Sequence, residues 1–143
     1  LTLKFFSETD ENKIPAICQT MQTSASKSKP FTLNIANTGI FGSRYDPKVI
    51  WFGINNNEVL QNLAENIFAE LEAVDYARDR QNFVPHLTIG RIKEVNDKSL
   101  FQQIISKYNT IDIQQEHVGE IVLYESILDR KGPTYVKIFS AQL

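Results

Sequence analysis

The segment FVPHLTIGRIK, residues 83–93, decides the fold more than any other stretch of this chain. Its apolar and β-branched residues predict a strand from Val84 to Ile92. Side chains two positions apart on a strand share a face, so we expect His86 and Thr88 to project the same way. The segment thus places an imidazole beside a hydroxyl on a rigid element.

That pair of side chains suits phosphate chemistry. The His86 imidazole can move a proton near neutral pH, and the Thr88 hydroxyl can donate a hydrogen bond to a non-bridging phosphate oxygen. We expect the intervening Leu87 and Ile89 to anchor the opposite face of the strand in the core. One such pair is weak evidence, because a histidine on a strand is more often a satisfied structural residue.

The opening residues of the chain repeat the centre of this segment. Leu1-Thr2-Leu3-Lys4 aligns with Leu87-Thr88-Ile89-Gly90, and the position matching the histidine falls immediately before Leu1. Opening a phosphodiester without metal needs a base that activates water and an acid that protonates the departing oxygen. Two His-x-Thr strands facing one phosphate would supply both. The β-branched, aromatic and other apolar residues of LTLKFF, residues 1–6, also predict a largely buried strand.

Composition limits the alternatives. At 143 residues, with 42% hydrophobic and 22% charged residues, the chain fits one globular domain. A net charge of −2 argues against binding long nucleic acid by counterion release, but leaves room for a small phosphate ligand. The longest apolar run, Val49 to Ile54, is too short to cross a bilayer.

Cysteine and histidine usage points to a reducing compartment and to chemistry without metal. Cys18 is the single cysteine, so no intramolecular disulfide can form and the cytoplasm is the expected location. His86 and His117 lie 31 positions apart, outside any HExxH or paired Cys/His pattern. We expect no metal and no other cofactor.

Helices and strands interleave along the rest of the chain, and no glycine-rich phosphate loop is present. This pattern favours an α+β fold with antiparallel or mixed pairing over a doubly wound sheet. A first helix is expected from Asn12 or Lys13 through Met21, and a second along Leu60–Leu71, after caps at Asn55-Asn56-Asn57. A third helix is expected after the N-cap Asp97. Its apolar side carries Leu100, Phe101, Ile104, Ile105 and Tyr108. Strands are expected at Phe31–Ile35 and Lys48–Ile54 and in a hairpin from Glu120 to Gln142 turning at Asp129–Pro133, with loops at Thr23–Pro30 and Asn37–Pro47.

Aromatic residues outside the motif leave alternatives open. Phe41 and Tyr45 fall in the predicted loop, where they could stack on a base or simply anchor the loop. Tyr135 could line a site or belong to the hairpin. We expect Trp51 in the core and His117 on the surface.

These segments resemble the 2H phosphoesterase superfamily, named for two HxTx motifs. The best match is its bacterial and archaeal RNA 2′,3′-cyclic phosphodiesterase branch, also called 2′-5′ RNA ligase or LigT. LTLKFFSET resembles the first motif, which histidine normally precedes directly, and FVPHLTIGRIK resembles the second. The remaining likeness lies in GIFGSRYDPKVIWFGI and in YESILDRKGPTYVKI, which is similar to a C-terminal hairpin.

The resemblance implies a two-lobed α+β fold of pseudo-twofold related halves, with mostly antiparallel sheets flanking a central cleft. It implies one domain over residues 1–143, with the family's strand and helix upstream of the first motif missing. His86 would be the general base, Thr2 and Thr88 would hold the phosphate, and the acid histidine matches no residue. Arg91 would be a charge-assisted phosphate ligand. Strict alternation turns Arg91 away from His86, unless the strand twists or ends near Gly90.

The implied function is a metal-independent RNA 2′,3′-cyclic phosphodiesterase that opens cyclic phosphate RNA ends to 2′-phosphates. We expect a monomer, although the sequence does not fix the oligomeric state. Ligation through a 2′-5′ bond is attached to the family by name. Alternatives are a phosphodiesterase for another small cyclic phosphate, such as ADP-ribose 1″,2″-cyclic phosphate, or a non-catalytic module that binds nucleotides or RNA ends. A chain starting at Leu1 would lack the acid and should be nearly inert, because each proton-transfer group contributes about 10²–10⁴-fold.

Overall fold

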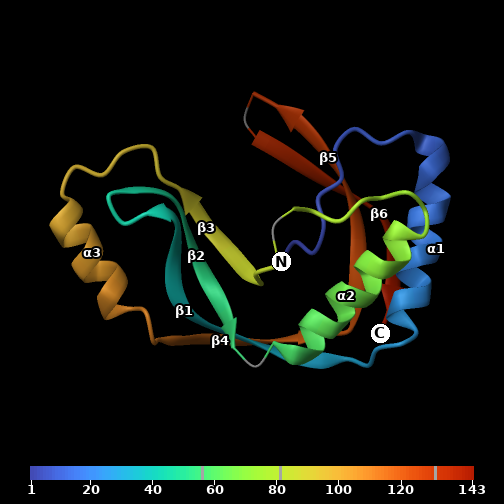
Figure 1. Cartoon of the computed structure of the whole chain (residues 1–143), viewed down its shortest axis with the longest axis horizontal. Helices are drawn as coiled ribbons and strands as arrows, with labels where there is room; N and C mark the ends of the chain where they lie inside the picture. The colour runs from blue at the N-terminus through green and yellow to red at the C-terminus, as the bar shows by residue number, and fades with distance from the viewer. Residues whose placement is uncertain (56, 81, 131) are drawn as a thin grey trace. The chain divides into compact units, whose positions relative to one another are not determined.

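The computed structural model describes residues 1–55, 57–80, 82–130 and 132–143 (Figure 1). The chain falls into two compact units, each built from segments that are separate in the sequence. The first unit comprises Leu1–Lys4, Thr32–Glu58 and Phe83–Glu116, and the second Phe5–Phe31, Val59–Asn82 and His117–Leu143.

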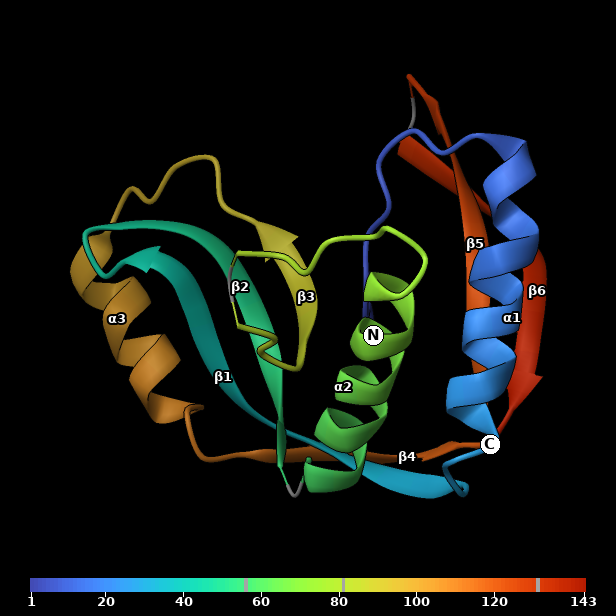
Figure 2. The same cartoon turned by 45° about the vertical axis from the view of Figure 1, so that its right-hand side comes forward.

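The first unit is a curled sheet with one helix against it. Its strand order is β3-β2-β1-β4, with β1 at Phe31–Ser43, β2 at Asp46–Asn55, β3 at His86–Arg91 and β4 at Asp112–Val118. Helix α3, Lys98–Lys107, lies against one face of this sheet (Figures 1 and 2). The Thr38 hydroxyl on β1 donates to the Ile105 carbonyl of α3 at 3.3 Å, which identifies the covered face.

The predicted loop from Asn37 to Pro47 is instead the part of a long β-hairpin that includes its turn. Asn37 lies at a shift in the β1–β2 register with a φ of 63°, so its backbone forms a bulge within the strand rather than a loop. Gly42, with a φ of 97°, lies at a second shift just before the turn. The prediction was wrong because Asn and Gly mark bulges and tight turns as well as loops.

The predicted strand at residues 1–6 is also absent, although every one of these residues is described. No sheet in the structure contains them, so their backbone makes no ladder hydrogen bonds. Leu1 is 44% exposed and Phe5 is 73% exposed. An apolar sequence forms a strand only where a neighbouring strand supplies its hydrogen bonds, and here none does.

The second unit packs two helices with a two-stranded hairpin. The 3-10 helix η1 at Glu11–Lys13 leads into α1 at Ile14–Ala25, and α2 spans Glu58–Glu72. Strands β5, Glu120–Asp129, and β6, Gly132–Gln142, form the hairpin against which α1 packs. The buried apolar residues of this unit are Ile17, Met21, Ala25, Leu60, Leu63, Ala64, Ile67, Leu71, Ile121 and Ala141.

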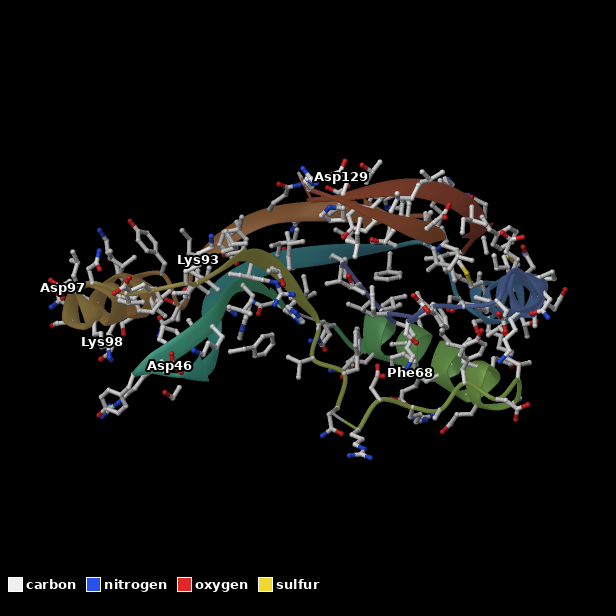
Figure 3. The ribbon with its side chains drawn as sticks, turned by 90° about the horizontal axis from the view of Figure 1, so that it is seen from above. Asp46, Phe68, Lys93, Asp97, Lys98 and Asp129 are labelled. Atoms are coloured by element: carbon white, nitrogen blue, oxygen red, sulfur yellow. The ribbon has the colours of Figure 1, made fainter. Side chains whose placement is uncertain are left out.

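The helix ends predicted from capping residues and proline were largely correct. Pro15 lies in the first turn of α1, as predicted, although the helix runs on to Ala25 and shortens the predicted loop. Asp97, at the start of α3 in Figure 3, accepts from the backbone N–H of Leu100 at 2.9 Å, which confirms its role as N-cap. Before α2, the Asn57 side chain donates to the Ile54 carbonyl, while Asn56 lies outside the described residues.

The strand pairs confirm an α+β fold with antiparallel sheets. The β1–β2, β2–β3 and β5–β6 ladders are all antiparallel. The predicted C-terminal hairpin is confirmed, with its turn between Asp129 and Gly132; Lys131 within that turn lies outside the described residues.

Candidate active site on strand β3

Three polar side chains of β3 share one face of the sheet: His86, Thr88 and Arg91. In the β2–β3 ladder they pair respectively with Gly53, Trp51 and Val49. These three β2 residues are two apart and share a face. Directly paired residues of an antiparallel ladder project to the same side of the sheet. An imidazole, a hydroxyl and a guanidinium are therefore presented together.

A β-bulge brings the guanidinium to this face. The pairing of β2 with β3 skips Ile89, which has no partner on β2. One extra residue in a strand reverses the alternation beyond it, so Arg91 returns to the side of His86. Strict alternation predicted the opposite, and the bulge is the reason for the difference.

The His86 ring has a defined tautomer. Its Nδ1 lies 2.7 Å from the Val84 carbonyl oxygen, and a carbonyl oxygen can only accept a hydrogen bond. The neutral ring therefore carries its proton on Nδ1, which leaves the Nε2 lone pair available. Nε2 has no hydrogen-bond partner among the residues that the structure describes. A histidine held in this way can accept a proton through Nε2.

Two aromatic rings surround His86. The Phe41 ring lies 4.7 Å from the imidazole, centroid to centroid, at an interplanar angle of 90°. The Trp51 ring lies 6.4 Å from the imidazole and 5.5 Å from Phe41. Trp51 is half-buried on the His86 face rather than in the core, so the prediction for it was wrong.

Two glycines make room for the Trp51 indole. A Cβ at Gly39 would collide with Cζ2, Cη2 and Cε2 of the ring, and a Cβ at Gly53 would lie 3.3 Å from Cζ3. Gly53 is also the residue that pairs with His86, so β2 presents no side chain there. Phe41 on β1 can therefore reach an imidazole on β3, two strands away.

The remaining polar groups on this face are open to solvent. Thr88 and Arg91 are both exposed, and Arg91 forms no ion pair with any described residue. Thr2 is exposed and belongs to the same compact unit as β3, but it lies on no strand. The structure thus brings His86, Thr88 and Arg91 together and leaves Thr2 off the sheet.

The apolar residues of β3 do not reach the core. Leu87 is 38% exposed and Ile89 is 48% exposed, because β3 is the edge strand of its sheet. The prediction that they anchor the opposite face was therefore wrong. β3 is held by its ladder with β2, and Pro85, just before the strand, is buried.

Other candidate residues lie outside strand β3. His117 is exposed near the end of β4, and Tyr135 on β6 is 63% exposed, with its ring 6.3 Å from that of Tyr124. Tyr45 is 58% exposed in the β1–β2 turn, where the Arg44 guanidinium stacks 4.5 Å from its ring centroid. None of these side chains makes a ring contact with His86.

Metal and membrane features are absent from the described part of the chain. No group of three histidine, cysteine, aspartate or glutamate side chains is close enough together there to hold a metal ion. Across the same residues, no helix combines the length and the apolar character needed to cross a membrane.

A half-buried histidine with an exposed threonine and an exposed arginine on one strand face could bind a phosphate and transfer a proton. A sequence model of the 2′-5′ RNA ligase superfamily matches residues 1–129. The RNA 2′,3′-cyclic phosphodiesterase of Aquifex aeolicus is 31% identical over 141 residues, covering 96% of this chain and 74% of its own length. The chain therefore belongs to the 2′-5′ RNA ligase superfamily.

Solved structures share the fold. A protein of Thermus thermophilus superimposes with a TM-score of 0.78 at 24% identity, over 99% of this chain and 75% of its own. LigT of E. coli, solved with 3′-AMP, superimposes with a TM-score of 0.74 at 19% identity, over 99% of this chain and 74% of its own. Both likenesses confirm the predicted LigT-like α+β fold.

Proposed function

We propose that this chain is a metal-independent RNA 2′,3′-cyclic phosphodiesterase, a hydrolase that opens 2′,3′-cyclic phosphate ends of RNA to 2′-phosphates. The observation that carries the proposal is the register of β3, which presents His86, Thr88 and Arg91 on one face. Membership of the 2′-5′ RNA ligase superfamily, and a relative named RNA 2′,3′-cyclic phosphodiesterase at 31% identity, support it.

His86 is the general base in this proposal. A water molecule attacks the phosphorus, and Nε2 takes the proton that the water loses as the new P–O bond forms. The Val84 carbonyl supports this role, because it holds the ring proton on Nδ1 and leaves the Nε2 lone pair available. The P–O3′ bond then breaks, and the 2′-phosphate remains on the sugar.

Thr88 and Arg91 are the phosphate ligands. The hydroxyl of Thr88 donates to a non-bridging oxygen, and the guanidinium of Arg91 donates charge-assisted hydrogen bonds to the same group. Arg91 suits this role because it is exposed and has no ion-pair partner among the described residues. Thr2 is the second hydroxyl donor, a role that rests on the internal repeat alone.

The departing O3′ must receive a proton from an acid. In the internal repeat, the position that aligns with His86 falls immediately before Leu1, and we propose that a histidine there would be this acid. Kinetic measurements are made on the intact gene product. The internal repeat calls for one acid and one base, so the pH profile of kcat/KM should have two opposed limbs.

The decisive experiment compares two histidine substitutions in that protein. We expect His86→Gln to lower kcat/KM on an RNA oligonucleotide ending in a 2′,3′-cyclic phosphate by about 10²–10⁴-fold in the presence of EDTA. His117→Gln is the matched control and should keep the activity, because His117 is exposed near the end of β4. Equal activity of the two variants would refute the role of His86.

Substrate class follows from the same assay. A cyclic mononucleotide and ADP-ribose 1″,2″-cyclic phosphate test the alternative of a small cyclic phosphate. We propose RNA 3′ ends as the partner, since the relative carries RNA in its name. We propose the cytoplasm as the location, because a lone cysteine fits a reducing compartment.

A further inference from the structure

His86 is held by a hydrogen bond and by ring contacts, the nearer with Phe41 and the more distant with Trp51, and the two kinds of contact restrain different motions. A histidine side chain turns about two torsions, χ1 and χ2. The hydrogen bond from Nδ1 to the Val84 carbonyl fixes the position of one ring atom but allows the ring plane to tilt about it. A second contact is needed to fix the plane.

Phe41 supplies that contact. Its ring stands perpendicular to the imidazole at a centroid distance of 4.7 Å, within the range of a favourable edge-to-face pair. Such pairs are directional, so tilting the imidazole away from the perpendicular weakens the contact. Phe41 itself rests beside Trp51, at 5.5 Å, and Trp51 is fixed over Gly39.

We propose that Phe41 is a positioning residue for His86: with Trp51 behind it, it holds the imidazole in the orientation in which Nδ1 binds the Val84 carbonyl and Nε2 stays free. The proposal rests on the proposed function for its kinetic consequence. Its structural content concerns the His86 ring alone and can be measured without substrate.

The first measurement is the tautomer of the His86 ring. In ¹⁵N–¹H correlation spectra of the imidazoles, the set of signals that His86→Gln removes belongs to His86, and His117→Gln assigns the set of His117 in the same way. At about pH 8.5, where an ordinary imidazole is neutral, we expect the ¹⁵N shifts of His86 to report the Nδ1–H tautomer. We expect Phe41→Leu to move both shifts toward an averaged value, because the ring then exchanges between orientations.

The second measurement is turnover of the cyclic phosphate oligonucleotide. Misplacing a catalytic group by about 1 Å can cost up to about 10²-fold in rate. We expect Phe41→Leu to lower kcat about tenfold or more and to leave KM within about twofold, because Phe41 is not assigned to the phosphate. Phe41→Tyr should have the wild-type kcat and the wild-type tautomer of His86, since tyrosine keeps an aromatic ring at position 41.

Phe52→Leu is the matched control for loss of a half-buried ring. Phe52 lies next to Trp51 on β2, but it pairs with Thr38 and Leu87 on the face that α3 covers. Phe52→Leu should lower stability without changing the His86 tautomer. The proposal is overturned if Phe41→Leu keeps the wild-type ¹⁵N shifts, or if Phe41→Tyr fails to restore them.

The two proposals fail separately. If the wild-type protein does not hydrolyse any cyclic phosphate, the proposed function is wrong, while the tautomer of Phe41→Leu still decides the positioning role. If the wild-type protein hydrolyses a cyclic phosphate, and Phe41→Leu matches Phe52→Leu in both kcat and the ¹⁵N shifts of His86, only the positioning role of Phe41 is wrong.

Discussion

Replacing Gly39 with alanine tests whether the Trp51 indole organises the site. The Cβ of an alanine at this position would collide with three atoms of the indole ring. The ring is the rigid part of the side chain, so it must move as a whole, or the β1–β2 ladder must open. Either movement disturbs the contacts that join Trp51 to Phe41 and His86.

The magnitude follows from the cost of overpacking. Adding carbon to a filled space costs about 1–3 kcal/mol in the free energy of unfolding. For a chain of 143 residues, each kcal/mol lowers the Tm by roughly 3 °C, so Gly39→Ala should melt about 3–9 °C below wild type. Trp51 is the single tryptophan, so its fluorescence reports the displacement directly. We expect a shift in the emission maximum and a fall in kcat.

Gly90→Ala is the control. Gly90 lies in the same sheet, on β3, and a Cβ there would meet no atom within 4 Å. Its substitution should leave Tm unchanged or raise it slightly, because alanine restricts the unfolded chain. If Gly39→Ala and Gly90→Ala have the same Tm and the same emission spectrum, the indole does not fill that space and the argument is wrong.

Three further predictions concern charge and capping. Arg91→Ala should lower kcat/KM on the cyclic phosphate by about 10- to 100-fold, because a charge-assisted hydrogen bond is worth about 1.5–3 kcal/mol. Arg91→Lys should recover part of the lost kcat/KM. If Arg91→Ala lowers kcat/KM no more than Arg44→Ala does, Arg91 is not a phosphate ligand. Asp97→Ala should lower the free energy of unfolding by about 1 kcal/mol in urea titration, whereas Asp97→Asn, which keeps the capping oxygen, should stay close to wild type. The hydrogen bond from Lys137 holds the pKa of the Glu120 carboxyl below its usual range, so this carboxylate adds stability at neutral pH that is lost as the pH falls through the lowered pKa. The Tm difference between wild type and Glu120→Gln should thus be present at about pH 7 and shrink below about pH 4, and a pH-independent difference would count against it.

Sequence patterns predicted those parts of the site that depend on neighbouring residues. The spacing of His86 and Thr88 on one strand face is a local property of an extended backbone, and it was correct. The cap at Asp97 and the hairpin after Asp129 were likewise set by residues within a few positions of each other. Such features need no knowledge of which strand lies beside which.

The failures share a physical cause, namely pairing between distant segments. The bulge at Ile89 exists because β2 skips that residue, and nothing in HLTIGR alone shows which residues lie opposite it. The contact between Phe41 and His86 joins strands 45 positions apart, across a glycine on the strand between them. The prediction for residues 1–6 was wrong because a strand also needs a neighbouring strand. Their pattern suits a strand, but no strand of the described sheets pairs with them.

The alternation of β2 links the stability of the sheet to the geometry of the site. Trp51 and Gly53 face His86, while Phe52 between them faces the side on which α3 packs. A one-residue slip of β2 would exchange these two faces, and would turn the indole away from His86 and place Phe52 beside it. The register of the hairpin is therefore a requirement of the site and not only of the fold. Substitutions that loosen the β1–β2 turn should accordingly reduce catalysis through the orientation of His86, even though the turn itself makes no ring contact with it.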